Sequence, residues 1–373
     1  IEQHDIILTT YTLLMRDKKL LLQHEFYYLI LDEAQYIKNH KAKTTQIAHQ
    51  IKAKHRLCLT GTPMENHLGE LWSLFHFIMP GFLGDSQHFR AVYKNPIERE
   101  DHQDRRQMLS SRVKPFMLRR QKADVLQDLP EKNIIFCRVQ LSGKQQDLYE
   151  SIRLSMEAKV RDAIQAQGLA RSHIIILDAL LKLRQVCCDP RLISLPSAKA
   201  AHGQSAKLEM LMEMLPNMID EGRKILIFSQ FTKMLTLIEN ELKDRNIGYA
   251  KLTGATTNRD KQVERFQSGR VPVFLISLKA GGTGLNLTTA DTVIHYDPWW
   301  NPAVENQATD RAHRYGQKNT VFVYKMQAVN TVEETIQEMQ EKKAALTEGL
   351  FAEDGSGGLK LTAEDLKNLF KSY

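Results

Sequence analysis

Short apolar runs that end in polar turns constrain the fold of this chain more than any other feature. Val273 to Ile276 leads into a glycine-rich turn, and Thr292 to Tyr296 leads into a turn that contains two prolines. Similar runs occur at Lys224 to Phe228 and at Tyr249 to Leu252, with helix-like segments after them. Because strands that alternate with helices form a parallel sheet with right-handed crossovers, we expect an α/β fold.

The glycine-rich turn, SLKAGGTGLNL, has the composition of a ligand-binding turn. It contains Gly281, Gly282 and Gly284. Glycines let the backbone approach a ligand closely and leave amide groups free to point at it. Taken alone, the turn is better explained as an ordinary glycine-rich loop.

A helix is expected to begin at Pro302, with Asn301 as its cap. Gln307, Arg311 and Arg314 follow at the spacing i, i+4 and i+7, so we expect their side chains on one face of this helix. Two guanidinium groups and an amide that point the same way suit a polyanion such as a triphosphate. A solvated basic helix face is the alternative.

The whole run from residue 274 to 317 resembles the last two motifs of superfamily-two helicase-type motors, and QATDRAHRYGQ is similar to the Swi/Snf family of double-stranded-DNA translocases. The resemblance extends over the whole chain. It implies two RecA-like parallel-sheet lobes with helical insertions, ATP and Mg²⁺ between the lobes, and double-stranded DNA as a partner. It further implies that Arg311 and Arg314 stabilise the charge that develops during hydrolysis. Gln307, Gly282 and Gly284 would contact the nucleotide or couple it to movement.

Two adjacent carboxylates, Asp32 and Glu33, follow the apolar run Phe26 to Leu31. That run is expected to be a strand buried on both faces, and open α/β sheets bind ligands at the carboxyl ends of such strands. Hydrolysis of a nucleotide needs one acid to hold Mg²⁺ and another to orient or deprotonate the attacking water. The resemblance assigns the metal to Asp32 and the water to Glu33. A helix cap followed by a first-turn acid is the alternative.

The segment LTGTPMEN, which contains Thr60, follows a further strand at Arg56 to Leu59. Hydroxyl groups on a tight turn can connect the acid pair to the other lobe. The resemblance makes this segment a coupling motif, with Thr60 and Gln35 as nucleotide-binding or coupling residues. A capped turn before the helix at Leu68 to Phe77 is the alternative.

Four residues are implied by the resemblance to contact the DNA backbone: Thr9, Thr10, Thr253 and Lys279. The two N-terminal threonines end the strand-like run Asp5 to Thr10, where their hydroxyl groups could donate hydrogen bonds to phosphate. A helix cap explains either threonine equally well. The lysine precedes the glycine turn, where a phosphate contact is favoured.

Composition adds little to this interpretation. The chain has 51 basic and 44 acidic residues and a net charge of +7, which is compatible with nucleic acid but common among other proteins. No apolar run is long enough to span a membrane, so no membrane partner is expected. No Cys-x-x-Cys pair exists, and the four cysteines are expected to be reduced thiols. We expect a cytoplasmic protein, associated with the nucleoid if bacterial, or a nuclear protein if eukaryotic.

Five ranges describe the expected organisation. Residues 1–139 form a partial first lobe with a helical insertion at about 80–122, and residues 140–203 form a helical protrusion and hinge. Residues 204–328 form the second lobe, and residues 329–373 form a brace helix and tail.

A phosphate-cradling loop of the form G-x-x-x-x-G-K-[ST] is absent from the sequence. We therefore expect a fragment of a remodelling motor that is inactive by itself. The strand lost with that loop should leave apolar surface exposed on residues 26–31, and the first lobe should be poorly stable alone. The alternatives are a catalytically silent DNA-binding or interaction module and a subunit of a strand-separating helicase. A DNA-bound protein is a further expected partner.

Overall fold

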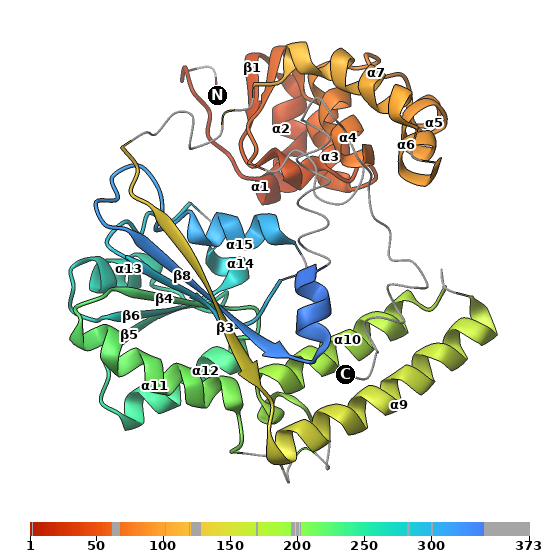
Figure 1. The fold of residues 1–373 in the computed structure, drawn as a ribbon. Coiled ribbons are helices and arrows are strands. Elements are labelled where there is room, and N and C mark those ends of the chain that lie inside the picture. Colours follow the sequence, from red (N-terminus) through yellow and green to blue (C-terminus); the bar gives the residue numbers. More distant parts are fainter. Residues whose placement is uncertain are drawn as a thin grey trace. The chain divides into compact units, whose positions relative to one another are not determined.

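The computed structural model describes residues 1, 3–61, 68–100, 102–118, 120, 128–168, 171–194, 198, 201, 203–281, 284–299 and 301–338. The chain divides into two compact units, formed largely by Ile1–Arg119 and by Arg120–Glu341. Each unit contains its own sheet and its own apolar cores, so the two are described separately (Figure 1).

The first unit contains a parallel pair of strands, β1 (Glu25–Leu31) and β2 (Lys52–Cys58). The helices around them are α1 (Tyr11–Arg16), α2 (Lys18–Gln23), η1 (Ala34–Ile37), α3 (Lys43–Gln50) and α4 (Leu68–Ile78). Their core includes Leu31, Ile37 and Phe77.

Strand β1 differs from the expected strand because it is not buried on both faces. The exposed fractions of Tyr27, Tyr28 and Ile30 are 64%, 56% and 53%. The apolar surface that the sequence predicts on this strand is therefore present.

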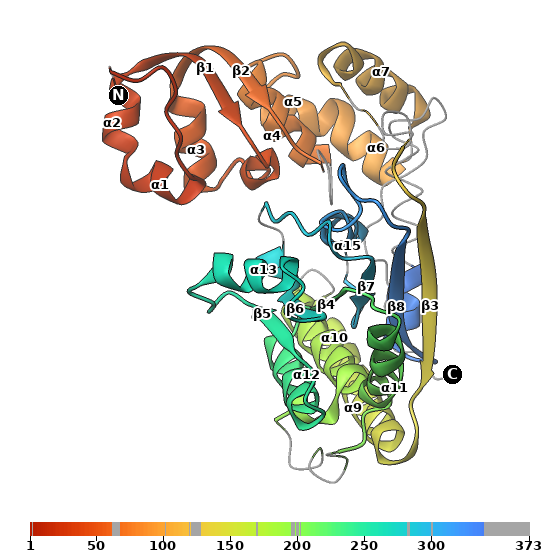
Figure 2. The same ribbon diagram turned by 90° about the vertical axis from the view of Figure 1, so that its left-hand side faces the viewer.

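A second, entirely helical group completes the first unit. It consists of α5 (Ser86–Phe89), the π-helix η2 (Arg90–Lys94), α6 (Asn95–Glu100), α7 (Gln103–Val113) and η3 (Lys114–Phe116). Phe89 and Tyr93 pack with Leu71, Trp72 and Phe75 of α4 in one core, which attaches this group to the rest of the unit (Figure 2). The helical character predicted for this region is confirmed in its described part.

The second unit is built on a six-stranded sheet with the order β3-β8-β7-β4-β6-β5, in which every neighbouring pair is parallel. Its strands are β3 (Lys132–Gln140), β4 (Ile225–Ser229), β5 (Tyr249–Leu252), β6 (Val273–Ser277), β7 (Thr292–His295) and β8 (Val321–Val329). Residues of β4, β6 and β7 are all buried, as expected for strands covered on both faces. The α/β fold with parallel sheets is confirmed.

Strand β3 corrects the expected domain boundary. We expected residues 133–139 to end the first lobe, but β3 pairs with β8 along its whole length, from Lys132 opposite Val321 to Gln140 opposite Val329. This pairing joins segments far apart in the sequence, which no local pattern could indicate.

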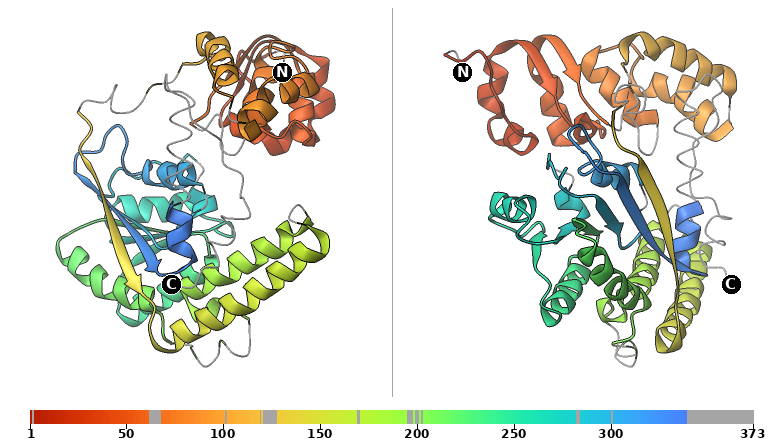
Figure 3. Two further views of the ribbon diagram at one scale, coloured as in Figure 1. Left: turned by 45° about the vertical axis from the view of Figure 1, so that its right-hand side comes forward. Right: turned by 60° about the vertical axis from the view of Figure 1, so that its left-hand side comes forward.

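Helices cover both faces of this sheet (Figure 3). One face packs against α11 (Ala206–Asp220) and α12 (Thr232–Asp244), and the other against α13 (Arg259–Gln267), α14 (Leu278–Gly281) and α15 (Pro302–Thr309). The long helices α9 (Gly143–Gln167) and α10 (His173–Cys188), followed by η5 (Pro190–Leu192), pack together. They share a core with Val332 and Ile336, just after β8.

Two further comparisons with the expected elements concern the ends of the described chain. Residues 5–10 form no strand, and Thr10 instead caps α1, accepting a 3.3 Å hydrogen bond from the Leu13 amide. The expected brace helix is present in its described part, since residues 332–338 are helical, and the rest of it lies outside the described residues. None of the helices in the described ranges has the length and apolar character needed to cross a membrane.

Candidate functional site

The acid pair lies at the carboxyl end of β1, as the sequence predicts. Asp32 Oδ1 accepts a 2.9 Å hydrogen bond from the Glu33 amide, and the Tyr11 hydroxyl donates a 2.7 Å hydrogen bond to the Asp32 carbonyl. Burial, with Cys58, Asp32 and Glu33 adding to it, raises the pKa of Tyr11, so this hydroxyl stays protonated as a donor.

Glu33 adopts a left-handed backbone conformation, with φ 49° and ψ 50°. This conformation costs a residue with a side chain roughly 1–2 kcal/mol, and such strain persists only where surrounding contacts impose it. Here the next amide, Ala34 N, donates a 2.9 Å hydrogen bond to the Leu59 carbonyl and fixes the turn to the segment after β2.

A chain of hydrogen bonds connects this carboxylate to Thr60. The Thr60 hydroxyl donates to Gln35 Oε1 at 2.7 Å, and Gln35 Nε2 donates to Glu33 Oε2 at 2.7 Å. The alternative placed Asp32 as the cap, but the residue at the N-cap position of η1 is Glu33, and the Glu33 side chain makes no capping hydrogen bond. The structure brings together three residues that the sequence assigned to one site.

The carboxylates suit a metal ion that arrives with phosphate. Asp32 is exposed. Of its two carboxylate oxygens, only Oδ1 receives a hydrogen bond from the described residues. Within the described ranges, no group of three or more His, Cys, Asp or Glu side chains could hold a metal ion. Since Mg²⁺ is commonly held by one or two carboxylates together with substrate phosphates, Asp32 and Glu33 fit a magnesium–nucleotide complex better than a permanent metal site.

The two candidate arginines are not on the expected helix. Helix α15 begins at Pro302 and is capped by Asn301 as predicted, but it ends at Thr309, so Arg311 and Arg314 lie in the following turns. Arg311 is 9% exposed, and its carbonyl accepts a 3.0 Å hydrogen bond from Leu287, just after the glycine turn. The prediction that these side chains share one helix face is therefore wrong. A backbone hydrogen bond nevertheless connects the arginine segment to the residues after the glycine turn.

Gln317 determines the shape of these turns and was missed in the sequence. Its buried side chain donates to the Ala290 carbonyl at 2.7 Å and to the Ala312 carbonyl at 3.0 Å. Its Oε1 accepts from the amides of Lys318 and Asn319. It closes the motif QATDRAHRYGQ, so its position in that motif was the available signal.

The remaining candidates of the second unit gather at the carboxyl edge of the sheet. Thr253 follows β5, and the exposed Lys279 lies on α14 directly after the neighbouring strand β6. The Thr253 hydroxyl accepts a 3.3 Å hydrogen bond from the Ala255 amide, so it also shapes its own turn. Gly284 has a φ of 49°, which a glycine adopts easily.

Three candidate residues remain. Gly282 lies outside the described residues. Gln307 is half-buried on α15, and Thr9 is exposed before α1.

A buried polar pair at the same edge was also missed. Ser229, which ends β4, donates a 2.5 Å hydrogen bond to Asp297, which follows β7. Burial raises the pKa of Asp297, and the nearby Arg184 and the Ser229 hydrogen bond oppose that rise. Arg184 also donates to the Pro298 carbonyl. The signal was present as two polar residues at the carboxyl ends of neighbouring strands.

Two protein-family models match this chain. Residues 1–192 match the model of the SNF2-related domain, and residues 206–316 match that of the helicase conserved C-terminal domain.

Relatives named as ATP-dependent helicases cover nearly the whole chain. A protein of Mycoplasma pneumoniae, named an uncharacterized ATP-dependent helicase, is 38% identical over 99% of this chain and 35% of its own length. A putative ATP-dependent helicase/translocase of Bacillus subtilis is 39% identical over 99% of this chain and 40% of its own length. The ISWI chromatin-remodeling complex ATPase ISW1 of Saccharomyces cerevisiae is 34% identical over 92% of this chain and 31% of its own length. The chain thus spans about a third to two fifths of these relatives.

A solved structure agrees with the sequence comparisons. The SWI2/SNF2 ATPase core of Sulfolobus solfataricus in complex with double-stranded DNA matches with a TM-score of 0.53 and 34% identity, over 100% of this chain and 78% of that one. The family match, the relatives and the parallel-sheet fold agree. This chain belongs to the SNF2 family of helicase-like proteins.

Proposed function

We propose that this chain is part of an ATP-driven motor that moves along double-stranded DNA. The observation that carries the proposal is the hydrogen-bonded chain from Thr60 through Gln35 to Glu33, beside the exposed carboxylate of Asp32. These hydrogen bonds connect the Glu33 carboxylate, which can orient a water molecule, to the segment that contains Thr60. Movement of that segment can couple the state of the nucleotide to the other lobe. The Bacillus relative named as a putative helicase/translocase and the archaeal core in complex with duplex DNA support this proposal.

Each candidate residue has a defined part in hydrolysis. Asp32 holds Mg²⁺, which neutralises charge on the phosphates when it is bound. Glu33 orients the attacking water, and Gln35 fixes the position of the Glu33 carboxylate through its 2.7 Å hydrogen bond. Arg311 and Arg314 stabilise the charge that develops on the transferred phosphoryl group, a contribution worth roughly a thousandfold or more in rate.

DNA contacts are proposed to go to the phosphate backbone. Thr10 accepts the Leu13 amide as a helix cap, which leaves its hydroxyl proton available to a phosphate oxygen. Thr9, Thr253 and Lys279 are the other proposed contacts. Backbone contacts of this kind are independent of base sequence and weaken as salt increases. By analogy with the yeast relative, whose name is that of a chromatin-remodeling ATPase, a DNA-bound protein is the proposed target.

ATP hydrolysis with and without duplex DNA, at low salt, tests this proposal. We expect the 373-residue chain to be inactive, because its sequence contains no G-x-x-x-x-G-K-[ST] motif. A longer polypeptide in which such a segment precedes this chain should hydrolyse ATP faster when duplex DNA is added. Duplex-stimulated hydrolysis by the chain alone would show that another segment holds the triphosphate.

Two variants identify the water-directing acid. In the longer polypeptide, Glu33→Gln should abolish hydrolysis and retain ATP binding, whereas Glu25→Gln, at the exposed start of β1, should change neither. Hydrolysis that survives Glu33→Gln would remove Glu33 from the proposed role.

Strand separation is the second candidate, because relatives carry the name helicase. An unwinding assay on a labelled duplex separates the two functions. We expect movement along DNA, measured by displacement of a bound triplex strand, without release of single strands. ATP-independent DNA binding with no hydrolysis in the longer polypeptide would instead indicate a silent DNA-binding module.

A further inference from the structure

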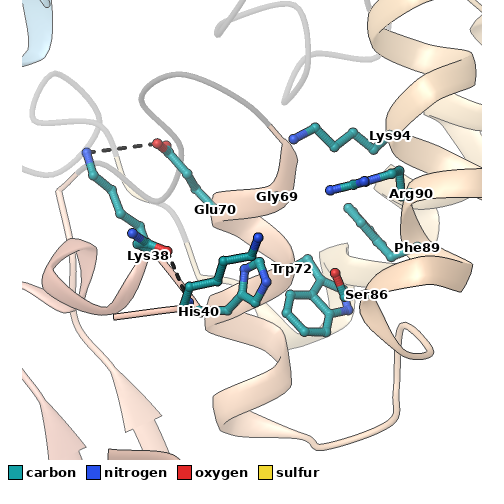
Figure 4. Close-up of a pocket in the computed structure, with 11 residues that line it drawn as sticks. Lys38, His40, Gly69, Glu70, Trp72, Ser86, Phe89, Arg90 and Lys94 are labelled. Carbon is teal, nitrogen blue, oxygen red and sulfur yellow. Dashed lines mark hydrogen bonds and ion pairs between the residues drawn. The ribbon is translucent and has the colours of Figure 1, made fainter. Parts of the chain in front are cut away.

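A pocket of about 340 Å³ lies within the first unit, and its lining includes neither Asp32 nor Glu33 (Figure 4). Trp72 of α4 and Phe89 of α5 give it aromatic walls. Figure 4 shows Arg90 and Lys94 extending into it from one side, with Lys38 and His40 on the other. Its volume is within the range of small-molecule sites, which usually combine apolar walls with a few polar groups.

Positive charge dominates the lining. Among the described residues of the lining, the cations Lys38, Lys41, Arg90 and Lys94 accompany one carboxylate, Glu70. Glu70 is 4% exposed, and its Oε1 lies 3.9 Å from Lys38 Nζ. One carboxylate cannot balance four cations, so the pocket has an excess of positive charge that an anionic ligand would neutralise.

His40 also lines the pocket. Its ring meets Trp72 edge-on, with ring centroids 5.4 Å apart. Burial lowers the pKa of His40, and the charges of Lys41, Arg90 and Lys94 lower it further.

We propose that this pocket binds a small phosphate-bearing anion. Arg90 and Lys94 lie four residues apart in the π-helix η2 and present a guanidinium and an ammonium group to the same space. A guanidinium fits phosphate oxygens through two parallel hydrogen bonds, and an ammonium adds a compact charge. The aromatic walls suit the non-phosphate part of such a ligand. The proposal is independent of the proposed motor function, because none of the proposed ATP or DNA contacts lines this pocket.

Phosphate could also come from DNA, and the two sources require separate measurements. Calorimetry with sodium pyrophosphate probes a small ligand, and fluorescence anisotropy with a short labelled duplex probes DNA. The test variant is Arg90→Gln with Lys94→Gln. The matched control is Lys19→Gln with Lys52→Gln, which removes the same charge at exposed positions on α2 and β2.

We expect pyrophosphate to bind the 373-residue chain and the control alike, and to bind the test variant at least about tenfold more weakly, since hydrogen bonds to charged groups are lost. Arg90→Lys with Lys94→Arg keeps the charge and should retain most of the affinity. Circular dichroism of all variants verifies that they are folded.

The DNA measurement identifies the source. If the test variant also loses DNA affinity relative to the control, and pyrophosphate competes with DNA, the bound phosphate belongs to the duplex backbone. If DNA affinity equals that of the control, the ligand is a small phosphorylated molecule. Equal affinity of test variant and control for both pyrophosphate and DNA, or no binding of either by the chain, overturns the proposal.

Discussion

The Thr60 hydroxyl donates a 2.7 Å hydrogen bond to Gln35 Oε1, and this contact joins the segment after β2 to the segment after β1. Gln35 can accept from Thr60 and donate to Glu33 at the same time only because its amide has both groups. The relay therefore depends on an amide at position 35, and a carboxylate or an apolar side chain there would break it.

Gln35→Leu should lower ATP hydrolysis by the longer, loop-containing polypeptide about ten- to a hundredfold, since one hydrogen bond to a charged group is worth roughly 1.5–3 kcal/mol. Thr60→Val should have a smaller effect. Because both residues act through one chain, the double variant should lose no more than Gln35→Leu alone. Gln23→Leu, at an exposed position on α2, is the control. Additive losses would show that Thr60 and Gln35 act separately.

His295 should make the second unit less stable in acid. It is fully buried on β7, and its Nε2 lies 2.9 Å from Thr309 Oγ1. Burial lowers the pKa of His295 to about 4; Glu305 opposes this and Lys325 adds to it. The unfolded chain therefore takes up a proton that the folded chain excludes, so stability is complete above about pH 6.5 and falls as the pH decreases toward 4.

The loss attributable to His295 over this pH range is about 3 kcal/mol. Urea unfolding followed by tryptophan fluorescence in a Trp72→Phe background reports the second unit. His295→Gln should make the free energy of unfolding depend less on pH between pH 4 and 6.5. His55→Gln, at an exposed position in the first unit, should not change this dependence. If the free energy of unfolding changes equally with pH with and without His295, the loss of stability in acid does not come from His295.

Lys279 should contribute one phosphate contact to DNA binding. It is exposed at the carboxyl edge of the sheet, on α14. Lys279→Ala is expected to weaken binding equally for different duplex sequences and to reduce the slope of log affinity against log salt by about one. Lys261→Ala, on the exposed face of α13, should leave the slope unchanged. A slope unaltered by Lys279→Ala would exclude this contact.

Local features of the fold were predictable because they depend on neighbouring residues. The apolar runs predicted β4 to β7, and Asn301 caps α15 with a 3.0 Å hydrogen bond from the Ala303 amide, as its position before a proline indicates. The acid pair after β1 was likewise predictable, since a polar pair directly after an apolar strand lies at its carboxyl end. Thr60 was likewise expected in the turn after β2, but its coupling role was implied by the family resemblance, and its hydrogen bond to Gln35 was not predicted.

Features that depend on distant residues were not predictable. Strand β3 joins the second sheet through pairing with β8, and Ser229 meets Asp297 across 68 residues. The expected helix face through Arg311 failed for a similar reason. The segment after Thr309 continues as turns with short-range backbone hydrogen bonds, and Gln317 and the contact of the Arg311 carbonyl with Leu287 hold it against distant residues. Residue spacing alone contains no information about such partners.

Lys207 and Glu333 form a fully buried ion pair, with 2.6 Å between Nζ and Oε2. Lys207 also donates to the carbonyls of Tyr296 and Met326, and Glu333 accepts from the Ala328 amide. Burial by itself would lower the pKa of Lys207, but Glu333 and the thiols of Cys188 and Cys187 outweigh it, so the pKa is raised and the ammonium stays charged. The pair thus connects α11 and the ends of β7 and β8 to the segment that follows β8.

Lys207→Met should destabilise the second unit by about 3–5 kcal/mol, because it leaves a carboxylate buried without its partner. Lys207→Met with Glu333→Leu should recover much of that loss, since apolar side chains of similar size need no charge compensation. Lys182→Met is the matched control, because Lys182 pairs at 2.8 Å with Asp178 on the partly exposed surface of α10 and its loss should cost under about 1 kcal/mol. Urea unfolding of the four proteins measures these differences. A double variant as unstable as Lys207→Met would show that the carbonyl contacts of Lys207, and not its charge pairing, hold these elements together.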